Sequence, residues 1–559
     1  MTTNTGDVDV VAGQLRQSGP GGSEAILPPV RGRWLALTAA LLGWMFDGAE
    51  MGVFSLVGRP AIQDLLGPQY EHDVARWLGV ITGLFLVGAA TGGVLFGWLG
   101  DRIGRVRAMT LSILTYALFT GMCGLSANPV QLGIFRFIAS LGMGGEWSLG
   151  VALVMEVFPN RSRAFMAGLI GAAANVGYLM VGLVGFALLA AITQLHDGLL
   201  AMGVPVGLVE RLTAHQGWRL MMLFGIAPAL LTFFIRLFVP ESARWERERQ
   251  RGSTTHWATA DLLAVLIGAL GPAVMVYLYA WDATGSWRHT PAVRAVATVA
   301  GLVLAVVGYL YPVIRYLQRS AHIQAGVPGD FFRVTLGRMV LGACLSGVAL
   351  LGTWGATQQA PAWADKLTEA AHQQRVAELE QQGRSDAVSL LARPRAKEQM
   401  LIWLSVGAIV GTIGAALVGD WLGRRVTYFL LCLTSLVSVI WLFQFHTEYG
   451  PAMLFAAFLA GTFSASFYGW LPLYLPELFA TRVRATGQGF GFNFGRILAA
   501  VGSFQLGSLV AWFNQDIDLG LFRVIGGYAG ACTALSMIYV IGMFLIWIAP
   551  ETKGKPLPD

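Results

Sequence analysis

The sequence Gly-Asp-Arg-Ile-Gly-Arg occupies residues 100–105, and the similar sequence Gly-Asp-Trp-Leu-Gly-Arg occupies residues 419–424. Each copy is a short polar loop between two long apolar stretches, and two further pairs of similar segments follow in the same order. The matching segments are 100–105 with 419–424, 156–164 with 477–485, and 240–242 with 550–552. Three pairs in matched order indicate two related halves that begin and end on the same side of a membrane.

The composition around these loops is that of a membrane protein. Of the 559 residues, 55% are hydrophobic and only 13% are charged, about half the charged fraction of a soluble domain. Apolar runs of about 20 residues recur along the chain, and each is long enough to cross a hydrocarbon core as a helix. The net charge of +6 comes from Lys and Arg in short loops rather than from a basic surface, so nucleic acid is not expected as a partner.

The apolar runs predict an all-α membrane protein of about fourteen spans, arranged as six, two and six. The first six are expected at 34–57, 78–99, 108–127, 130–157, 165–193 and 218–239, the central two at 260–281 and 292–314, and the last six at 335–357, 400–418, 426–445, 451–475, 486–512 and 524–548. The predicted divisions are a disordered cytoplasmic tail over 1–30, a first half over 31–240, a central segment over 241–332 and a second half over 333–555.

The short Arg-rich loops place both termini in the cytoplasm, because positively charged loops stay on that side. The long segment 359–399 then falls outside, although it carries Lys and Arg. It has as many acidic residues as basic ones, and we interpret it as a surface helix. We expect a monomer in the cell inner (plasma) membrane.

No cofactor or metal site is expected. The four cysteines all fall inside apolar runs, without the spacing of a metal site; they are Cys123, Cys344, Cys432 and Cys532. The chain also lacks the nucleotide-binding GxxxxGKS loop of a primary pump and any intramembrane His constellation for catalysis. An enzyme is therefore not expected. A membrane sensor is not expected either, because the tails of about 30 and ten residues are shorter than a signalling domain.

The paired loops resemble the signature loop of the major facilitator superfamily, and Pro550-Glu551-Thr552-Lys553-Gly554 resembles the ending of its sugar-porter branch. Arg136, with Gly142 and Gly144, is similar to the fourth-span motif of the same superfamily. The resemblance implies two six-helix bundles that carry a small solute by alternating access.

In this superfamily the loop residues form a cytoplasmic latch that holds one conformation. Carried over by position, the latch residues are Asp101, Arg105, Asp420 and Arg424, with Glu156 and Glu477 as their partners. A carboxylate can accept hydrogen bonds at a helix N-terminus, and an arginine can pair with the acidic end of another span. The alternative is that these charges only fix the topology.

Charged residues inside spans are candidates for function, because each costs about 2.5–3.5 kcal/mol to insert at the bilayer centre. Asp47 lies near the middle of the first span, and Glu50 follows on the same helix face. Glu146 and Arg136 lie in the fourth span, and Arg496 lies near the middle of the eleventh. We predict that these five residues bind the substrate or carry the coupling proton. A structural ion pair is the alternative, for instance between Arg496 and Asp47 or Glu146.

Two local resemblances favour an organic acid as the substrate. Phe46-Asp47-Gly48 resembles a pattern of organic-acid and aromatic-acid proton symporters, although Ala49 and Glu50 depart from it. Gly145-Glu146-Trp147 is similar to a sequence in monocarboxylate and sialate proton symporters.

The sequence therefore predicts symport of a small organic acid with H⁺. Proton-coupled sugar uptake, and export of a drug or metabolite, stay open as alternatives. Four further side chains could line a cavity, although an aromatic side chain at helical spacing is more often packing: Trp354, Gln358, Tyr468 and Trp470.

Overall fold

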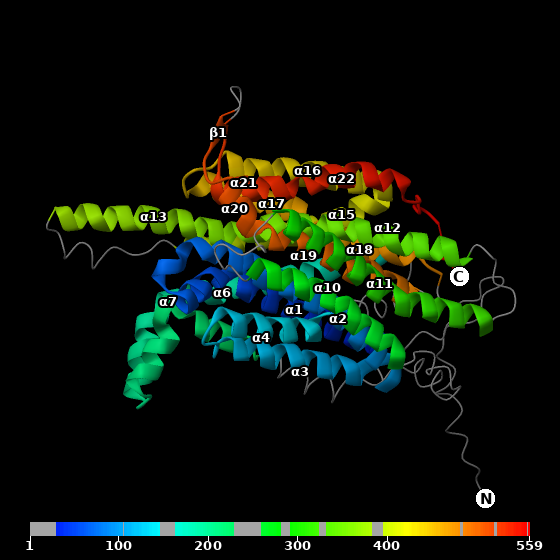
Figure 1. Ribbon diagram of the computed structural model, residues 1–559, viewed down its shortest axis with the longest axis horizontal. Helices are drawn as coiled ribbons and strands as arrows, with labels where there is room; N and C mark the ends of the chain where they lie inside the picture. The colour runs from blue at the N-terminus through cyan, green and yellow to red at the C-terminus, as the bar shows by residue number, and fades with distance from the viewer. Residues whose placement is uncertain are drawn as a thin grey trace, which may run out of the picture.

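The computed structural model describes residues 30–103, 105–145, 162–227, 259–280, 291–323, 331–382, 395–480, 484–518, 523–555 and 557–558. Almost all of these residues are helical, and the long helices lie side by side (Figure 1). Helices suit a bilayer because every backbone hydrogen bond is made within the segment. The predicted tail over residues 1–30 lies outside the described residues, except for its last residue.

The first half consists of long helices drawn in blue to turquoise in Figure 1. They are α1 (Val30–Leu66), η1 (Pro68–Asp73), α2 (Val74–Ile103), α3 (Arg105–Cys123), α4 (Pro129–Met143), α6 (Arg163–Ala201) and α7 (Val206–Phe224). The start of α4 is set by Asn128, whose side chain accepts a hydrogen bond of 2.8 Å from the backbone N–H of Gln131. This contact satisfies one of the donors that a helix N-terminus leaves unpaired.

The second half repeats this arrangement and ends in a short hairpin and two short helices. Its elements are α12 (Phe331–Leu351), η5 (Gly352–Ala356), η6 (Thr357–Gln359), α13 (Ala360–Gln381), α15 (Ala396–Leu422), α16 (Arg424–Gln444), α17 (Pro451–Ser464), α18 (Phe467–Tyr474), η7 (Leu475–Leu478), α19 (Arg484–Phe504), α20 (Leu506–Trp512), β1 (Ile517–Asp518), β2 (Arg523–Val524), α21 (Gly527–Ser536), α22 (Ile538–Leu545) and η9 (Ile546–Ile548). The two strands pair antiparallel, with Ile517 opposite Val524.

Two helix pairs join the halves: α6 packs against α15, and α2 packs against α19. Glycine makes one of these contacts close. A Cβ atom on Gly168 of α6 would lie 2.9 Å from the Cα atom of Ile413, so that a larger residue could not be accommodated without moving a helix. Small residues at such positions are typical of helix packing within membranes.

Ten helices of the described part are long and apolar enough to span a membrane. They coincide with the predicted first, second and fifth spans, with the second central span and with all six spans of the second half. The described part of α4 and residues Leu263–Met275 are shorter apolar helices, and α3 is a helix at the predicted third span. The predicted sixth span lies mostly outside the described residues. The all-helical prediction is confirmed, whereas the count of fourteen is not.

The outward faces of these helices are apolar. Examples are Val303 and Val307 on α11 (Pro291–Ile323) and Phe544 on α22, which are all more than half exposed. Rows of exposed hydrophobic side chains suit contact with lipid rather than with water. The chain is therefore a multi-pass membrane protein.

The central helices α10 (Thr259–Ala280) and α11 pack tightly against each other and lie beside α2. Gly268 and Gly308 allow this approach, since a Cβ atom on Gly268 would lie 3.0 Å from the Cα of Gly308. Tyr309 of α11 is hydrogen-bonded to Thr91 of α2 within the buried interface. The pair thus attaches to the outside of the two-half bundle.

The predicted surface helix within 359–399 is present as α13, but its first turns are buried rather than exposed. Trp363 is 5% exposed and Asp365 is 3% exposed. The reason is that α12, η5, η6 and α13 follow one another without interruption, so the first turns of α13 are still covered by the bundle. Only its later turns project beyond the other helices (Figure 1).

Candidate functional site

Glu50 and Arg136 form an ion pair within the first half. Both side chains are buried, and Nη1 of Arg136 donates to Oε1 of Glu50. Thr120 of α3 donates a second hydrogen bond of 2.9 Å to the same oxygen. The guanidinium also lies over the rings of Phe54 and Phe85, at 4.8 and 4.5 Å from the ring centres. This pair is enclosed by its own half of the molecule.

Arg496 of α19 has a different environment. The side chain is 7% exposed, and its Nη1 makes one long hydrogen bond of 3.3 Å to Asn493, one turn earlier on the same helix. Its guanidinium lies 5.0 Å from the centre of the Phe492 ring. Asp47 of α1 is the carboxylate that stabilises its charge, and the hydroxyl of Tyr468 is a further electrostatic neighbour.

The structure thus brings two pairs of the predicted residues together: Glu50 with Arg136, and Asp47 with Arg496. The first pair lies within one half, while the second joins α1 of the first half to α19 of the second. Glu146 lies outside the described residues. The roles of all five in binding or proton coupling stay predictions.

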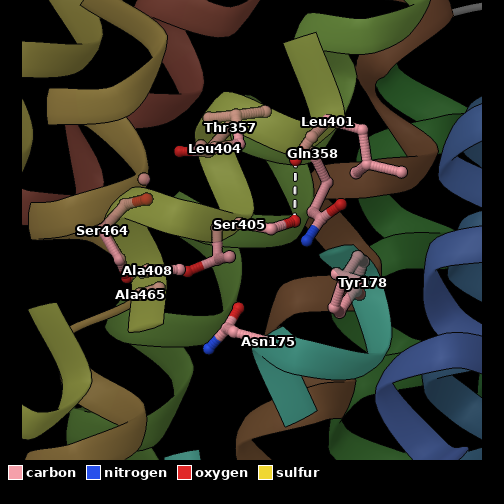
Figure 2. Close-up of a pocket in the computed structure, with 12 residues that line it drawn as sticks. Asn175, Tyr178, Thr357, Gln358, Leu401, Leu404, Ser405, Ala408, Ser464 and Ala465 are labelled. Atoms are coloured by element: carbon pink, nitrogen blue, oxygen red, sulfur yellow. Dashed lines mark hydrogen bonds between the residues drawn. The ribbon is translucent and has the colours of Figure 1, made fainter. Parts of the chain in front are cut away.

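A cavity lined by polar and apolar residues lies between the halves (Figure 2). Its space, including the part open to solvent, totals about 320 Å³. Its lining residues are Asn175, Tyr178, Thr353, Thr357, Gln358, Leu401, Leu404, Ser405, Ala408, Gly461, Ser464 and Ala465. Asn175 and Tyr178 project from α6, opposite the hydroxyls of Ser405 and Ser464 from the second half (Figure 2).

The cavity is lined by amide and hydroxyl groups together with small and apolar side chains, and no charged side chain is among its described lining residues. Of the four side chains suggested by the sequence, Gln358 is in the lining. Its Oε1 accepts a hydrogen bond of 2.8 Å from Ser55 of α1, which joins the two halves. Tyr468 is an electrostatic neighbour of both Tyr178 and Arg496, so the cavity and the buried charges are adjacent.

The second-half latch, defined as Asp420, Arg424 and Glu477, is assembled at the end of α15. Arg424 donates two parallel hydrogen bonds to Glu477, at 2.9 Å from Nε and 2.7 Å from Nη2. Such bidentate pairs are among the strongest and most directional that proteins form. Asp420 lies one turn before Arg424, at 3.5 Å from its Nη1, and is largely exposed.

Glu551 joins this latch, which the sequence did not indicate. Its carboxylate accepts hydrogen bonds of 3.1 Å from the backbone N–H groups of Arg424 and Arg425, at the start of α16. The preceding Gly423 has φ 103°, a conformation that favours glycine, and its backbone turns the chain toward Glu551. Thr552 completes the contact with a hydrogen bond of 2.6 Å to Glu477.

This arrangement sets the charge of Glu551. Partial burial raises the pKa of its carboxyl, but hydrogen bonds from four backbone N–H groups lower it more, so its net pKa lies below the ordinary 4.5. A carboxylate at a helix N-terminus is further favoured by the helix dipole. The available signal in the sequence was the repeated Pro-Glu after each half, at 240–241 and 550–551.

The first-half latch is only partly within the described residues. Asp101 lies at the end of α2 and Arg105 at the start of α3, which matches the placement of Asp420 and Arg424 on α15 and α16. Glu156 and Glu241 lie outside the described residues. The latch function of all six residues stays a prediction.

A further charged cluster, which sequence reasoning missed, lies at the other end of α15. Arg59 of α1 contacts Glu71 of η1 at 2.7 Å, and Asp365 and Glu369 of α13 at 3.1 and 2.7 Å. Arg59 was missed because the predicted first span ended at residue 57, which placed it in a loop.

Comparison with protein families gives a match to the sugar (and other) transporter family over residues 35–262. The cis,cis-muconate transport protein of Acinetobacter baylyi is 23% identical, over 90% of this chain and 94% of that protein. A probable 4-methylmuconolactone transporter of Cupriavidus pinatubonensis is 26% identical, over 92% of this chain and 90% of that protein. The niacin transporter of Acinetobacter baylyi is 29% identical over 41% of this chain and 46% of that protein.

Among solved structures, the proton:xylose symporter XylE matches with a TM-score of 0.58 at 18% identity, covering 94% of this chain and 98% of that one. A partially occluded, inward-open form of XylE from E. coli gives the same TM-score at 16% identity and covers 100% of that chain. At this level of identity the match establishes a shared fold. The matched family and relatives are membrane transporters and not enzymes.

Proposed function

Because the chain belongs to the major facilitator superfamily of membrane transporters, we propose that it carries a small organic anion together with H⁺ by alternating access. The observation that carries this proposal is the environment of Arg496. This buried guanidinium interacts electrostatically with Asp47 of the other half. Among the described residues, its hydrogen bond is the long contact to Asn493 on its own helix. A carboxylate substrate could supply further, stronger hydrogen bonds to this arginine.

Asp47 is proposed as the group that carries the proton. With the site empty, Arg496 stabilises the ionised carboxylate of Asp47. An arriving anion competes for that positive charge and so favours protonation of Asp47. Anion and proton then promote each other's binding, which is the thermodynamic requirement for symport.

The relatives support an anionic substrate. Muconate is a dicarboxylate, and two of the relatives matched along most of the chain are named for muconate and for a methylmuconolactone. The niacin transporter is named for a monocarboxylate. The cavity would supply hydroxyl and amide contacts to the rest of such a molecule.

A sugar is the second candidate, and the cavity lining favours it. Gln358, Asn175 and Ser405 offer neutral donors and acceptors of the kind that bind hydroxyl groups. The matched family model and the xylose symporter structure point the same way. In this case Arg496 would be a structural partner of Asp47.

The membrane arrangement is also part of the proposal. We infer fourteen spans, with halves over 31–240 and 333–555 around a central segment over 241–332, and both termini in the cytoplasm. The protein would act as a monomer in the cell inner membrane. The latch at the ends of α2 and α15 would then face the cytoplasm, and α13 would lie on the opposite side.

Uptake into proteoliposomes distinguishes the candidates. We expect cis,cis-muconate or nicotinate to accumulate when the outside is acidified, and xylose to remain at equilibrium. Accumulation of xylose with no response to either carboxylate would reject the anion and favour the sugar. Addition of a proton ionophore should abolish accumulation in either case.

A further inference from the structure

Arg59 is a buried cation shared by carboxylates from both halves of the molecule. Its side chain is 3% exposed and contacts Glu71 of η1 in its own half. Across the interface it contacts Asp365 and Glu369, which lie one turn apart on α13. We call these four residues the Arg59 cluster. The cluster lies at the α13 end of the bundle, whereas the second-half latch lies at the opposite end of α15.

The members of the cluster differ in how firmly each half holds them. Glu71 is fixed within the first half, because its second oxygen accepts a hydrogen bond of 2.9 Å from Gln63 of α1. Asp365 is buried with Arg59, at 4% side-chain exposure, and Glu369 is 24% exposed. Separation of the halves at this end would remove Asp365 and Glu369 from Arg59, but Glu71 would stay.

The Arg59 cluster lies on the same two segments as the contact at the cavity. Ser55 precedes Arg59 by one helical turn on α1, and it donates to Gln358 in the cavity lining. Gln358 in turn precedes Asp365 by two turns on the continuous η6 and α13 segment. An inner contact between Ser55 and Gln358 is thus followed outward by the contacts of Arg59 with α13.

We propose that the Arg59 cluster is the lock that closes the α13 end of the transport path, an inference that rests on the proposed alternating access. In the closed state Arg59 bridges the halves through Asp365 and Glu369. In the open state it keeps Glu71 as its partner, so the cation is never left buried and unpaired. Glu71 shares Arg59 with two other carboxylates in the closed state but is its proposed partner alone in the open state, so loss of Glu71 costs the open state more. Asp365 and Glu369 stabilise only the closed state.

The different roles of Glu369 and Glu71 predict opposite effects of two similar substitutions on the balance between the open and closed states. Glu369→Gln removes a closed-state contact and should favour opening. Glu71→Gln leaves the cross-interface contacts intact but deprives the open state of the partner of Arg59, and should favour closure. Glu378→Gln, on the same helix, changes a carboxylate that pairs with the exposed Arg375, and serves as the matched control.

The distance between the halves at this end provides the test. Spin labels would replace the exposed residues Gln69 of η1 and Gln374 of α13, in a background without the four native cysteines. Pulsed electron resonance in nanodiscs then gives the ratio of long to short distances. We expect Glu369→Gln to raise this ratio about tenfold, Glu71→Gln to lower it, and Glu378→Gln to leave it unchanged.

Equal distance distributions in all variants would contradict the proposed lock. Shifts of the same sign for Glu369→Gln and Glu71→Gln would contradict it too. Arg59→Gln should raise the ratio of long to short distances most strongly. If Arg59→Gln does not fold, the distances in Glu369→Gln test the proposal. The distance measurement needs no substrate. Absence of proton-driven uptake would therefore reject the proposed function. The distance measurement would still test the proposed lock.

Discussion

The two buried arginines near the middle of the molecule, Arg136 and Arg496, have opposite environments. Arg136 is paired with Glu50 inside its own half and lies between two aromatic rings. Arg496, among the described residues, makes one weak hydrogen bond on its own helix and interacts electrostatically with Asp47 of the other half. An arginine satisfied within one half can move with that half as a rigid unit, whereas one that faces the other half can respond to a ligand. We therefore propose a structural role for Arg136 and substrate binding for Arg496.

The largest expected effect is on stability, from breaking the first-half pair. Arg136→Ala leaves the buried Glu50 without its cation, and removal of one member of a buried pair costs about 3–5 kcal/mol. We expect a much lower melting temperature and poor yield of purified protein. Arg136→Ala combined with Glu50→Ala should recover part of the loss. A stable Arg136→Ala protein that has lost transport would assign Arg136 to the binding site instead.

Arg496→Ala should impair binding and lower the melting temperature less than Arg136→Ala does, because Asp47, as the proposed proton carrier, can become neutral by protonation when its cation is removed. Hydrogen bonds to a charged group contribute about 2 kcal/mol, so carboxylate affinity should fall about thirtyfold. Isothermal calorimetry on purified protein measures this directly. Arg496→Lys, which keeps the charge but not the two-pronged geometry, should be intermediate. Unchanged carboxylate affinity in Arg496→Ala would make Arg496 a structural residue like Arg136.

Latch substitutions should alter turnover rather than binding. Asp101→Asn changes the first repeated motif in the first half, and Glu477→Gln changes the second repeated motif in the second half. Each removes a charge that would hold one conformation. We expect turnover in proteoliposomes to fall about tenfold, with substrate affinity within about twofold of the parent protein. Loss of affinity with an unchanged conformational balance would contradict the latch.

The smallest expected effect is the pH dependence caused by Glu551. Because the pKa of Glu551 is lower in the folded protein than in the unfolded chain, its contribution to stability is present above the ordinary pKa of 4.5 and is lost as the pH falls through the folded value. The melting temperature should therefore fall more between pH 6 and pH 4 in the parent than in Glu551→Gln. Equal decreases of melting temperature in the two proteins would show that Glu551 does not cause the pH dependence.

The sequence predicted features that depend on local pattern and missed those that depend on distant partners. The apolar runs located every span of the second half, and their register placed Asp47 and Arg496 at similar depths, where the structure brings their charges together. The first turns of α13 look like a surface helix because their burial comes from other helices.

The contacts of Arg59 and Glu551 were missed for a related reason. Arg59 pairs with Asp365, and the carboxylate of Glu551 caps α16 more than a hundred residues earlier in the chain. The periodicity of a helix relates only residues a few positions apart, so it does not reveal contacts between such distant positions. Only the repeated Pro-Glu hinted that Glu551 matters.

The most direct test of the central claim is uptake by Asp47→Asn under an imposed pH gradient. If Asp47 carries the coupling proton, the variant should exchange labelled carboxylate across the membrane but should not concentrate it, because the neutral amide cannot take up or release H⁺. The parent protein, in matched proteoliposomes, should do both. If Asp47→Asn still concentrates the carboxylate against its gradient, the proton is carried elsewhere, and Glu146 and Glu50 become the candidates.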